Sequence, residues 1–349
     1  MTETIRILAL ETAVPNQKIS QEEIKDFAPR LFGGNPRLLE NMLPVYDNAG
    51  IEFRRLSQPL DWYARESSWK ENQTLFAEHA IRLLEEAVHK ALQASGIEPN
   101  QIDAVVTVCT TGISTPSLDV SLKNRVGFRD DIIRVPIFGW GCAGGVLGLM
   151  RAVDIAKAHP CTRVLLLVVE LCSLTFRPGD KSKSNIIASA LFGDGAAALI
   201  IGPSTKGEKF IAGKEHTWPN TEDIMGWRVE NDGLGVLFSK SIPSLVEREL
   251  GFLLKEFLMS KNLKLSEINA FSPHPGGEKV LNALETVFEI ESGTLYEARE
   301  ILRDYGNMSS ATVLFVLKRI LSKKIEGKCL MSSLGPGFSA AFALIETTN

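Results

Sequence analysis

The sequence predicts an α/β protein built from two related halves. Its 349 residues correspond to about two domains of average size, since a domain averages roughly 150 residues. Short uninterrupted apolar runs, typical of strands in a sheet covered on both faces, alternate with segments of helical periodicity. A unit of turn, helix and strand also occurs once in each half of the chain. Together these observations favour a layered α/β core.

Composition and charge exclude several classes of protein. Hydrophobic residues make up 44% of the chain and charged residues 23%, which allows a sizeable buried core. The net charge of −4 provides no basic surface for a polyanion, so nucleic acid is not an expected partner. The five cysteines have no metal-ligand spacing and no disulfide pattern, which favours a reducing compartment. Glu3, Arg6 and Glu11 interrupt the N-terminal segment, and the longest apolar run covers residues 164–169 only. A cytoplasmic protein without a transmembrane segment is therefore predicted.

The first half contains two predicted helices and two predicted strands. Apolar residues three and four positions apart predict a helix from Leu75 to Gly96, with the glycine as its C-cap. Ile102–Thr107 is expected to form a buried strand. The segment before Gly139 contains Pro136 and is therefore a poor candidate for a central strand. A turn at residues 139–142 then begins a small-residue segment, followed by a helix over residues 146–158 and a strand over residues 163–169.

The second half repeats this last unit. A turn at residues 305–307 leads into small residues, a helix over residues 312–324 and a strand over residues 329–332. The segment GDGAAALI at residues 193–200 is likewise matched by GPGFSAAFALI at residues 335–345. The repeat predicts two halves, residues 1–204 and 205–349. It places Cys142 and Asn307 at equivalent helix N-termini.

Cys142 is the strongest candidate for a reactive residue. Glycines surround it where a loop is followed by a helix, and a thiolate at a helix N-terminus has a lowered pKa because it faces unpaired N–H groups. The small neighbours also leave room for a substrate carbonyl. The alternative is that Cys142 is a small buried hydrophobic residue, as Cys109, Cys161 and Cys329 are expected to be.

The same segment matches a different motif. Residues 139–144, GWGCAG, have the G-x-G-x-x-G pattern of dinucleotide-binding proteins. The next acidic residue after a strand, Glu170, follows the first glycine by 31 positions, whereas the motif requires roughly 20. This spacing and the interrupted preceding strand argue against a dinucleotide cofactor.

Two further residues fit an acyl-transfer site. His274 lies between two prolines in a loop after the strand-like segment at residues 268–271, so its position is rigidly specified. Asn307 precedes a helix and can direct an amide N–H at a developing oxyanion. The alternatives are that His274 only caps a turn and that Asn307 is a helix N-cap. A Cys, a His and an Asn form a plausible catalytic set for acyl transfer.

These residues lie in motifs through which the chain resembles the type III polyketide synthases, the chalcone-synthase-like branch of the thiolase superfamily. The similarity extends from AVPN at residues 13–16 to GPGF at residues 335–338. It is carried by GCAGG at 141–145, ALFGDGAA at 190–197, HPGG at 274–277 and YGNMSSA at 305–311. The related ketoacyl synthases that start fatty-acid synthesis have different residues around the His and the Asn. The resemblance implies a thiolase-like fold, with the two halves in a layered αβαβα core.

The resemblance also implies an activity. An acyltransferase of this family loads an acyl group from coenzyme A onto Cys142 and extends it with malonyl-CoA. His274 would hold Cys142 as a thiolate, and His274 and Asn307 would donate hydrogen bonds to the thioester carbonyl and to the malonyl-derived enolate. Coenzyme A thioesters are then the substrates, and no metal or redox cofactor is expected. The family also implies a homodimer.

Other residues match family positions around the substrate. Phe192 corresponds to a gatekeeper between the CoA tunnel and the cavity, and Val236 stands where plant members have a second gatekeeper phenylalanine. Cys172 replaces the threonine of plant chalcone synthases. At these positions the chain resembles bacterial members of the family that use long acyl starters and release alkylpyrones or alkylresorcinols. The remaining expected substrate contacts are Thr111, Thr175, Ser309, Gly335, Pro336 and Gly337, with Arg54 and Arg55 as candidate contacts for the CoA phosphates.

Two other functions remain open from the sequence. One is a single-condensation ketoacyl synthase of the thiolase fold, which would release a ketoacyl product after one extension. The other is a catalytically silent homologue that binds acyl-CoA, against which the intact Cys, His and Asn argue.

Overall fold

The computed structural model describes residues 4–33, 40, 42–159, 161–239 and 241–348. Within this part of the chain the main sheet has nine strands in the order β11-β12-β13-β8-β1-β7-β6-β4-β5. These strands are β1 (Ile5–Ala13), β4 (Ala104–Cys109), β5 (Ile133–Phe138), β6 (Val164–Leu171), β7 (Asp194–Pro203), β8 (Glu208–Thr217), β11 (Ala270–Pro273), β12 (Gly327–Gly335) and β13 (Ser339–Thr347).

Strand pairing confirms the two related halves. In the first half β1 pairs with β7 and β7 with β6, both antiparallel, and β6 pairs with β4 in parallel. In the second half β8, β13, β12 and β11 follow each other with the same three senses of pairing. A short antiparallel contact between β1 and β8 joins the halves. The boundary that we expect after residue 204 lies between β7 and β8.

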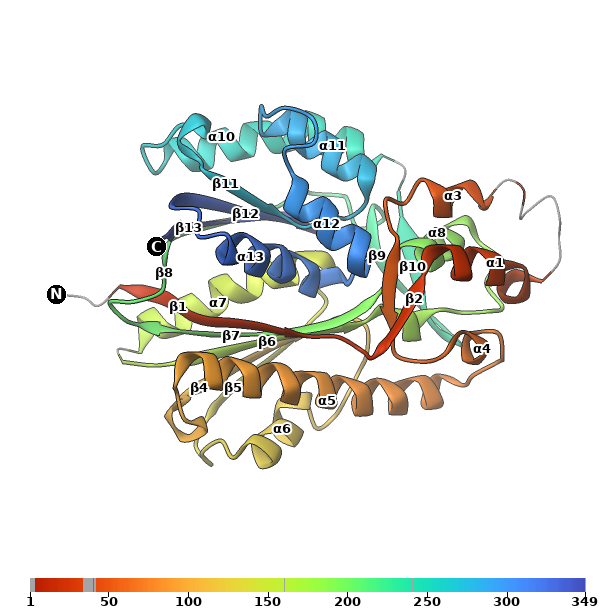
Figure 1. Cartoon of the computed structure of the whole chain (residues 1–349), viewed down its shortest axis with the longest axis horizontal. Helices are drawn as coiled ribbons and strands as arrows, with labels where there is room; N and C mark the ends of the chain where they lie inside the picture. Colours follow the sequence, from red (N-terminus) through yellow and green to blue (C-terminus); the bar gives the residue numbers. More distant parts are fainter. Residues whose placement is uncertain (1–3, 34–39, 41, 160, 240, 349) are drawn as a thin grey trace.

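The layers follow the expected order of helix, sheet, helix, sheet and helix (Figure 1). One outer layer contains α5 and α6, the central layer contains α7 and α13, and α10 and α11 cover the other side. The bounds of these helices, with those of α12 beside α13, are α5 (Trp69–Ser95), α6 (Leu118–Val126), α7 (Gly144–Ala158), α10 (Gly251–Met259), α11 (Glu278–Val287), α12 (Tyr296–Tyr305) and α13 (Thr312–Ser322).

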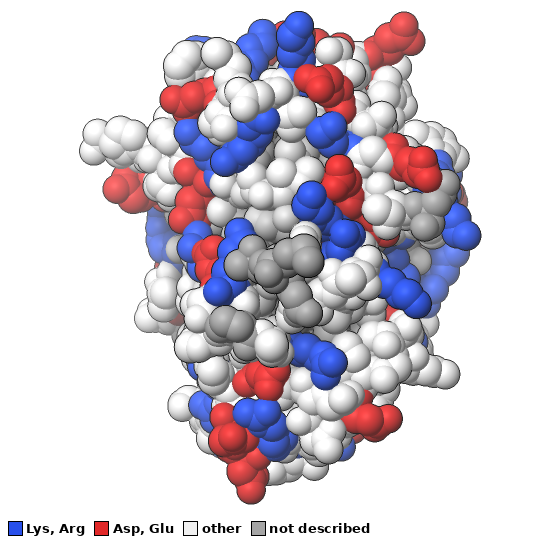
Figure 2. All heavy atoms as spheres, turned by 90° about the vertical axis from the view of Figure 1, so that its left-hand side faces the viewer, with Lys and Arg blue, Asp and Glu red and all other residues white. Residues whose placement is uncertain are grey.

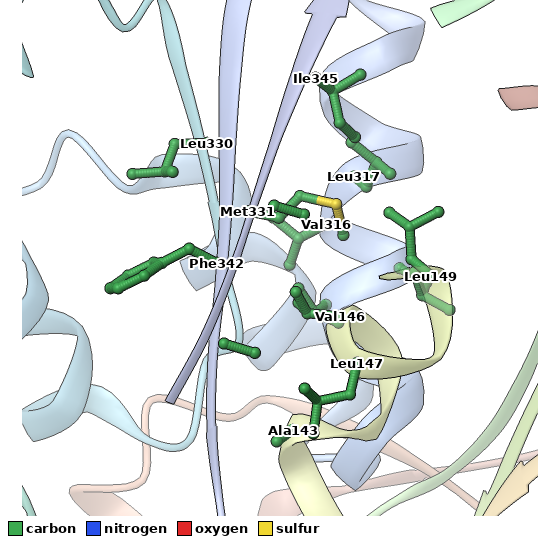
Figure 3. Packing of buried hydrophobic residues seen from close by; sticks show 14 of the residues in the cluster. Ala143, Val146, Leu147, Leu149, Val316, Leu317, Leu330, Met331, Phe342 and Ile345 are labelled. Carbon is green, nitrogen blue, oxygen red and sulfur yellow. The ribbon is translucent and has the colours of Figure 1, made fainter. Parts of the chain in front are cut away.

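The central helices are apolar on most of their surface because sheets cover them on both sides. Figure 3 shows part of the cluster that they form with the second-half strands. It includes Val146 and Leu149 of α7, Val316 and Leu317 of α13, and Met331 of β12, all nearly or fully inaccessible to solvent. Since Cys142 precedes α7 and Asn307 precedes α13, this packing brings the two candidate residues toward the same end of the central layer.

Smaller elements gather at one end of the core, at the right of Figure 1. Two antiparallel strand pairs, β2 with β3 and the hairpin of β9 with β10, lie there with several short helices. Their bounds are β2 (Gln17–Ser20), α1 (Gln21–Phe32), α3 (Pro44–Asp47), β3 (Phe53–Leu56), α4 (Leu60–Tyr63), α8 (Lys183–Leu191), β9 (Met225–Glu230) and β10 (Gly233–Phe238). A further short helix, α9 (Ile242–Leu245), contacts α11 and continues through a π-helical turn, Val246–Leu250, into α10.

Helix α5 and strand β4 begin at other residues than expected, and strand β5 forms despite its proline. Helix α5 begins at Trp69, six residues before Leu75, because Ser68 accepts a hydrogen bond from the Glu71 N–H and caps a first turn that lacks the apolar pattern. Strand β4 begins at Ala104, after a 3₁₀ turn at Pro99–Gln101. Strand β5 contains Pro136 and lies at the edge of the sheet, where a missing N–H is tolerated.

The distribution of charge on the surface agrees with the nearly equal numbers of basic and acidic residues, 38 and 42. Figure 2 shows basic and acidic side chains intermixed on the face that carries the chain ends, with no large area of one sign. None of the helices in the described ranges is long and apolar enough to cross a membrane.

Candidate active site

Cys142 lies in a 3₁₀ turn, Gly141–Ala143, that leads directly into α7, and it is 8% exposed. Gly141 has a φ of +47°, and a Cβ at this position would lie 2.7 Å from Cδ of Pro336, so the turn requires glycine. The Cys142 thiol donates to Oγ of Ser309 at 3.6 Å. A contact between the two halves therefore helps to define the position of the Cys142 thiol.

Strand β12 connects the His274 loop to the turn that contains Cys142. β11 pairs in parallel with β12, and the His274 N–H donates to the carbonyl of Ser332 at 2.7 Å. The next residue, Ser333, donates from Oγ to the carbonyl of Ala143, directly after Cys142, at 3.4 Å. His274 is 5% exposed, and neither of its ring nitrogens has a partner among the described residues. The ring is thus free to bind a substrate atom.

Asn307 has an amide whose orientation is fixed by hydrogen bonds. Its Oδ1 accepts from the Ser309 N–H at 2.8 Å, and its Nδ2 donates to the carbonyl of Gly276, in the His274 loop, at 3.4 Å. The backbone of Asn307 bridges to Phe192 and donates to the carbonyl of Leu191. Asn307 thus links the loop of His274 to the serine that contacts Cys142.

Burial dominates the electrostatics of the Cys and the His. It raises the pKa of the Cys142 thiol to about 12, and the nearby Glu170 adds to this rise. It lowers the pKa of His274 to about 3, because the imidazolium would lose its hydration. Both directions favour a neutral thiol and a neutral imidazole in the free protein. The lowered thiol pKa that we expected from the helix N-terminus is therefore outweighed by burial.

Glu170 is a buried residue whose place at the site the sequence analysis missed. Glu170 lies near the end of β6, close to Cys142, and is fully inaccessible to solvent. Its carboxyl group accepts hydrogen bonds from Ser310 Oγ at 2.5 Å, Thr111 Oγ1 at 2.8 Å and the Thr110 N–H at 3.1 Å. Burial raises its pKa to about 7. A glutamate at the end of an otherwise apolar strand was the available signal. Thr111, expected as a cavity residue, holds this carboxyl group and lines neither of the two pockets described below.

A small pocket of about 320 Å³ opens onto Cys142. Ser309, Phe192, Val236 and Pro336 line it as expected. Residues of the β9–β10 hairpin that the sequence analysis did not identify complete the wall, and Trp227 lies opposite Val236 in the β-ladder. Those additional residues are Met225, Gly226, Trp227 and Phe238.

A second cavity of about 500 Å³ lies beyond Phe192 and Val236, the two residues that line both spaces. The ring of Phe192 packs against Trp227 and Phe238, with centroids 6.1 and 5.7 Å apart. Cys172 and Thr175, both predicted to contact substrate, line this second cavity. Its other lining residues are Ile24, Leu31, Arg54, Leu56, Leu60, Tyr63, Ser173, Phe176, Asn185, Ala188 and Ser189.

The terminal motif shapes the site through its backbone. A Cβ on Gly335 would lie 2.6 Å from Cβ of Ala143 and 2.7 Å from the carbonyl oxygen of Trp140, so Gly335 allows β12 to approach the nucleophile turn. Gly337 has a φ of +123°, and Thr221 Oγ1 donates to its carbonyl at 2.7 Å. Neither glycine lines the pockets. Of the three predicted residues, only Pro336 does.

The expectation for Arg54 is wrong. Arg54 is 2% exposed, and its Nη1 donates to the carbonyls of Ser189 at 2.5 Å and Phe192 at 3.0 Å. It points inward because alternate side chains of β3 face the core, so it cannot reach CoA phosphates in solvent. Arg55, its neighbour on β3, is half-buried and donates to the carbonyl of Asn16 at 3.1 Å. The contact of Arg55 with CoA stays a prediction.

No group of three or more His, Cys, Asp or Glu side chains that could hold a metal ion occurs in the described ranges. The Cys142 thiol contacts the Ser309 alcohol and lies near the Glu170 carboxyl group, and the Asn307 amide connects Ser309 to the loop of His274. These are hydrogen-bonding and proton-transfer groups suited to acyl transfer.

Comparison with known proteins supports this interpretation. Residues 58–205 match the family model of the N-terminal domain of chalcone and stilbene synthases, and residues 210–344 match the C-terminal domain model. A putative chalcone synthase of Bacillus subtilis is 37% identical and covers 97% of both chains. An α-pyrone synthesis polyketide synthase-like protein of Mycobacterium tuberculosis is 28% identical, over 97% of this chain and 90% of the relative.

The fold agrees with a solved structure of the same family. The crystal structure of 1,3,6,8-tetrahydroxynaphthalene synthase from Streptomyces coelicolor, a bacterial type III polyketide synthase, superimposes with a TM-score of 0.93 at 28% identity, covering 99% of each chain. With both family models, the relatives and this fold in agreement, the chain belongs to the chalcone and stilbene synthases and is a type III polyketide synthase, an acyltransferase with the thiolase-like fold.

Proposed function

We propose that this type III polyketide synthase extends a long-chain acyl-CoA starter with malonyl-CoA and cyclises the product to an alkylpyrone or alkylresorcinol. The observation that carries the proposal is the second cavity, because its mainly apolar wall adjoins the Cys142 pocket at Phe192 and Val236. Each methylene group of an acyl chain buried there contributes about 0.8 kcal/mol. The space thus favours an aliphatic chain over a compact starter.

Starter loading uses Cys142 as nucleophile. The thiol gives its proton to His274, and the sulfur attacks the thioester carbonyl. The bond from that carbon to the sulfur of CoA then breaks, and the His274 imidazolium returns the proton to this sulfur, so that CoA leaves as a thiol. Since burial holds both groups neutral in the free protein, we place the proton transfer at the moment when the thioester carbonyl enters the pocket. The free ring nitrogens of His274 suit this role.

Chain extension uses the same groups for malonyl-CoA. Loss of CO₂ leaves the electron pair of the broken C–C bond on an enolate, whose carbon attacks the acyl group on Cys142 and releases the sulfur. Asn307 Nδ2 and an N–H of His274 donate to the enolate oxygen. The hydrogen bond from Ser309 to Asn307 Oδ1 supports this role, since it fixes which end of the amide is the donor. All substrates are coenzyme A thioesters, and these steps require no metal or redox cofactor.

The relatives' names do not agree on the type of ring that the product contains. The M. tuberculosis relative is named for α-pyrone synthesis, whereas the S. coelicolor structure is of a tetrahydroxynaphthalene synthase. The cavity beyond Phe192 favours the alkyl-substituted product class, in which the starter's chain is retained.

The test is a panel of acyl-CoAs from two to sixteen carbons and a hydroxycinnamoyl-CoA, each incubated with malonyl-CoA, with products identified by mass spectrometry. Long acyl starters should yield cyclised products after several extensions. Cys142→Ser should abolish product and the acyl-enzyme adduct, whereas Cys161→Ser, at an exposed cysteine, should change neither. A single ketoacyl product would indicate the one-condensation alternative, and turnover confined to the hydroxycinnamoyl starter would contradict the proposed substrate.

We also propose a homodimer that forms through the edge strand β5. Its Ile133 and Phe138 are 43% and 55% exposed, and an unpaired edge strand with apolar side chains is a natural site for self-association. The cytoplasmic location and the absence of a nucleic-acid partner stay predictions.

A further inference from the structure

Arg54 is a buried cation that lines the second cavity and has two side-chain nitrogens without a hydrogen-bond partner among the described residues. Its Nη1 binds two backbone carbonyls, but Nε and Nη2 are inaccessible to solvent and have no hydrogen-bond partner among the described residues. Within those residues, no carboxylate forms an ion pair with it either. Asp194 is the carboxylate whose charge opposes the lowering of the Arg54 pKa by burial, and it already accepts hydrogen bonds from Ser57 and Ser173.

The other polar side chains that line this cavity are satisfied. Each makes a hydrogen bond to the protein: Tyr63 to Ser173, Ser173 to Asp194, Thr175 to the Cys172 carbonyl, Asn185 to the carbonyls of Arg177 and Asp180, and Ser189 to the Ile186 carbonyl. The rest of the wall is largely aliphatic and aromatic. Among the described lining residues, Arg54 is thus the one with unpartnered side-chain donors.

The free atoms define the ligand that fits. Nε and Nη2 lie on one edge of the guanidinium plane and present two parallel N–H donors, the spacing that matches both oxygens of a carboxylate. Burial lowers the pKa of Arg54 to about 10, so the group keeps its charge at neutral pH. A buried charge without a counter-ion is costly, and an anion that enters the cavity relieves this cost.

We propose that the second cavity binds the far end of an acyl chain that terminates in a carboxylate, with Arg54 as its counter-ion. This inference rests on the proposed function and narrows its substrate to ω-carboxyacyl-CoA thioesters. The thioester end lies at Cys142, the chain passes Phe192 and Val236, and the methylene groups contact residues such as Leu31 and Phe176. The terminal carboxylate then accepts from Nε and Nη2 of Arg54.

The first test uses the wild-type enzyme and matched starters. Adipoyl-, suberoyl- and sebacoyl-CoA are compared with hexanoyl-, octanoyl- and decanoyl-CoA, and with the ω-methyl ester of each dicarboxylic thioester. At the chain length that spans the cavity, kcat/KM for the carboxylate starter should exceed that for the methyl-terminated starter by about tenfold or more, in line with a charge-assisted bidentate pair. The methyl ester should lose this advantage. Equal or lower kcat/KM for every carboxylate starter would overturn the inference.

The second test is Arg54→Lys, which keeps the charge and removes the two-donor edge. The ratio of kcat/KM between carboxylate and methyl-terminated starters should fall about tenfold. Arg65→Lys, at an exposed arginine paired with Glu71, is the matched control and should leave the ratio unchanged. Should Arg54→Lys fail to fold, the wild-type comparison decides alone. If neither series acylates Cys142, the proposed function fails; if only methyl-terminated starters are extended, the proposed function stands and this inference fails.

Discussion

Burial disfavours the charged forms of three groups in the free site, a thiol, an imidazole and a carboxyl group. The pKa of the thiol is raised, that of His274 is lowered and that of Glu170 is raised, each mainly by loss of hydration. An oxyanion formed there depends on the few N–H donors that point at it.

His274→Gln tests the histidine as the base for Cys142. Because burial places the pKa of the thiol at about 12, its thiolate fraction without a base should rise about tenfold per pH unit between pH 7 and 10. Acylation of Cys142 by acetyl-CoA, whose thioester brings about the proton transfer to His274 in wild type, should therefore be slow at pH 7 and steeply pH-dependent in the variant, and faster and flatter in wild type. Peptide mass spectrometry separates Cys142 from the exposed Cys161, which reports the reagent's own pH dependence. Identical Cys142 profiles in both proteins would rule out this role.

Glu170 makes stability depend on pH. The folded state holds its proton up to a pKa of about 7, whereas the unfolded state releases it near 4.5, so the stabilisation is present at low pH and is lost as the pH rises through 7. Between pH 5.5 and 8.5 this group should remove about 2 kcal/mol of unfolding free energy, from 1.36 kcal/mol per pKa unit. Glu170→Gln should remove this loss, as measured by urea unfolding at both values. A variant with the wild-type pH dependence would show that another group is responsible.

At the scale of elements, the approach of α7 to α13 depends on Gly145. A Cβ at Gly145 would lie 2.3 Å from the Ser310 carbonyl oxygen, which is backbone and cannot rotate away. We expect Gly145→Ala to cost about 1–3 kcal/mol of stability and to slow Cys142 acylation. Gly148→Ala on the same helix meets only the side-chain ends of Leu166 and Val108, at 2.9 and 3.0 Å.

The gain in helix propensity, about 0.5–1 kcal/mol, should largely offset that smaller overlap in Gly148→Ala. Thermal unfolding and acylation rates of both variants measure the difference. Equal losses in the two proteins would contradict the close approach at Gly145.

The β9–β10 hairpin determines how the two cavities connect. Val236 lines both, so Val236→Phe should narrow the passage and shift the starter optimum toward shorter acyl-CoAs. Acetylation of Cys142 should stay intact, because a two-carbon group does not pass Val236. Val229→Phe is the control on the same hairpin, since Val229 is 81% exposed. Competition assays with mixed acyl-CoAs measure the profile, and an unchanged optimum in Val236→Phe would show that the chain takes another path.

At the scale of the whole molecule, β5 leaves one end of the nine-stranded sheet unpaired within the described chain. We expect sedimentation velocity at micromolar concentration to give a dimer. Ile133→Lys combined with Phe138→Lys should convert it to a monomer, since charged side chains block edge pairing. Phe252→Lys, at a residue 77% exposed on α10, should leave the dimer intact. A wild-type monomer at these concentrations would disprove the association.

Much of the fold and the site could be predicted from local patterns. Local patterns depend on neighbours a few positions apart, so they can be recognised without tertiary information. They include the helical periodicity before Gly96, the apolar strand at residues 164–169 and the repeated small-residue turns. The motifs around Cys142, His274 and Asn307 pointed to the right family for the same reason. Their glycines mark tight turns that favour glycine, such as Gly141, which has a positive φ and no room for a Cβ.

Burial and contacts between distant residues were decided by the tertiary structure alone. Ser309 lies 167 positions from Cys142, and only the packing of α7 against α13 brings them together. Alternate side chains of β3 face opposite sides of the strand. Arg54 therefore points inward and Arg55 is half-buried because of how β3 packs on the core. The residue type, arginine in both cases, does not reveal this difference. The same holds for the pKa values of Cys142 and His274, because hydration depends on every element packed around a group and not on its neighbours in sequence.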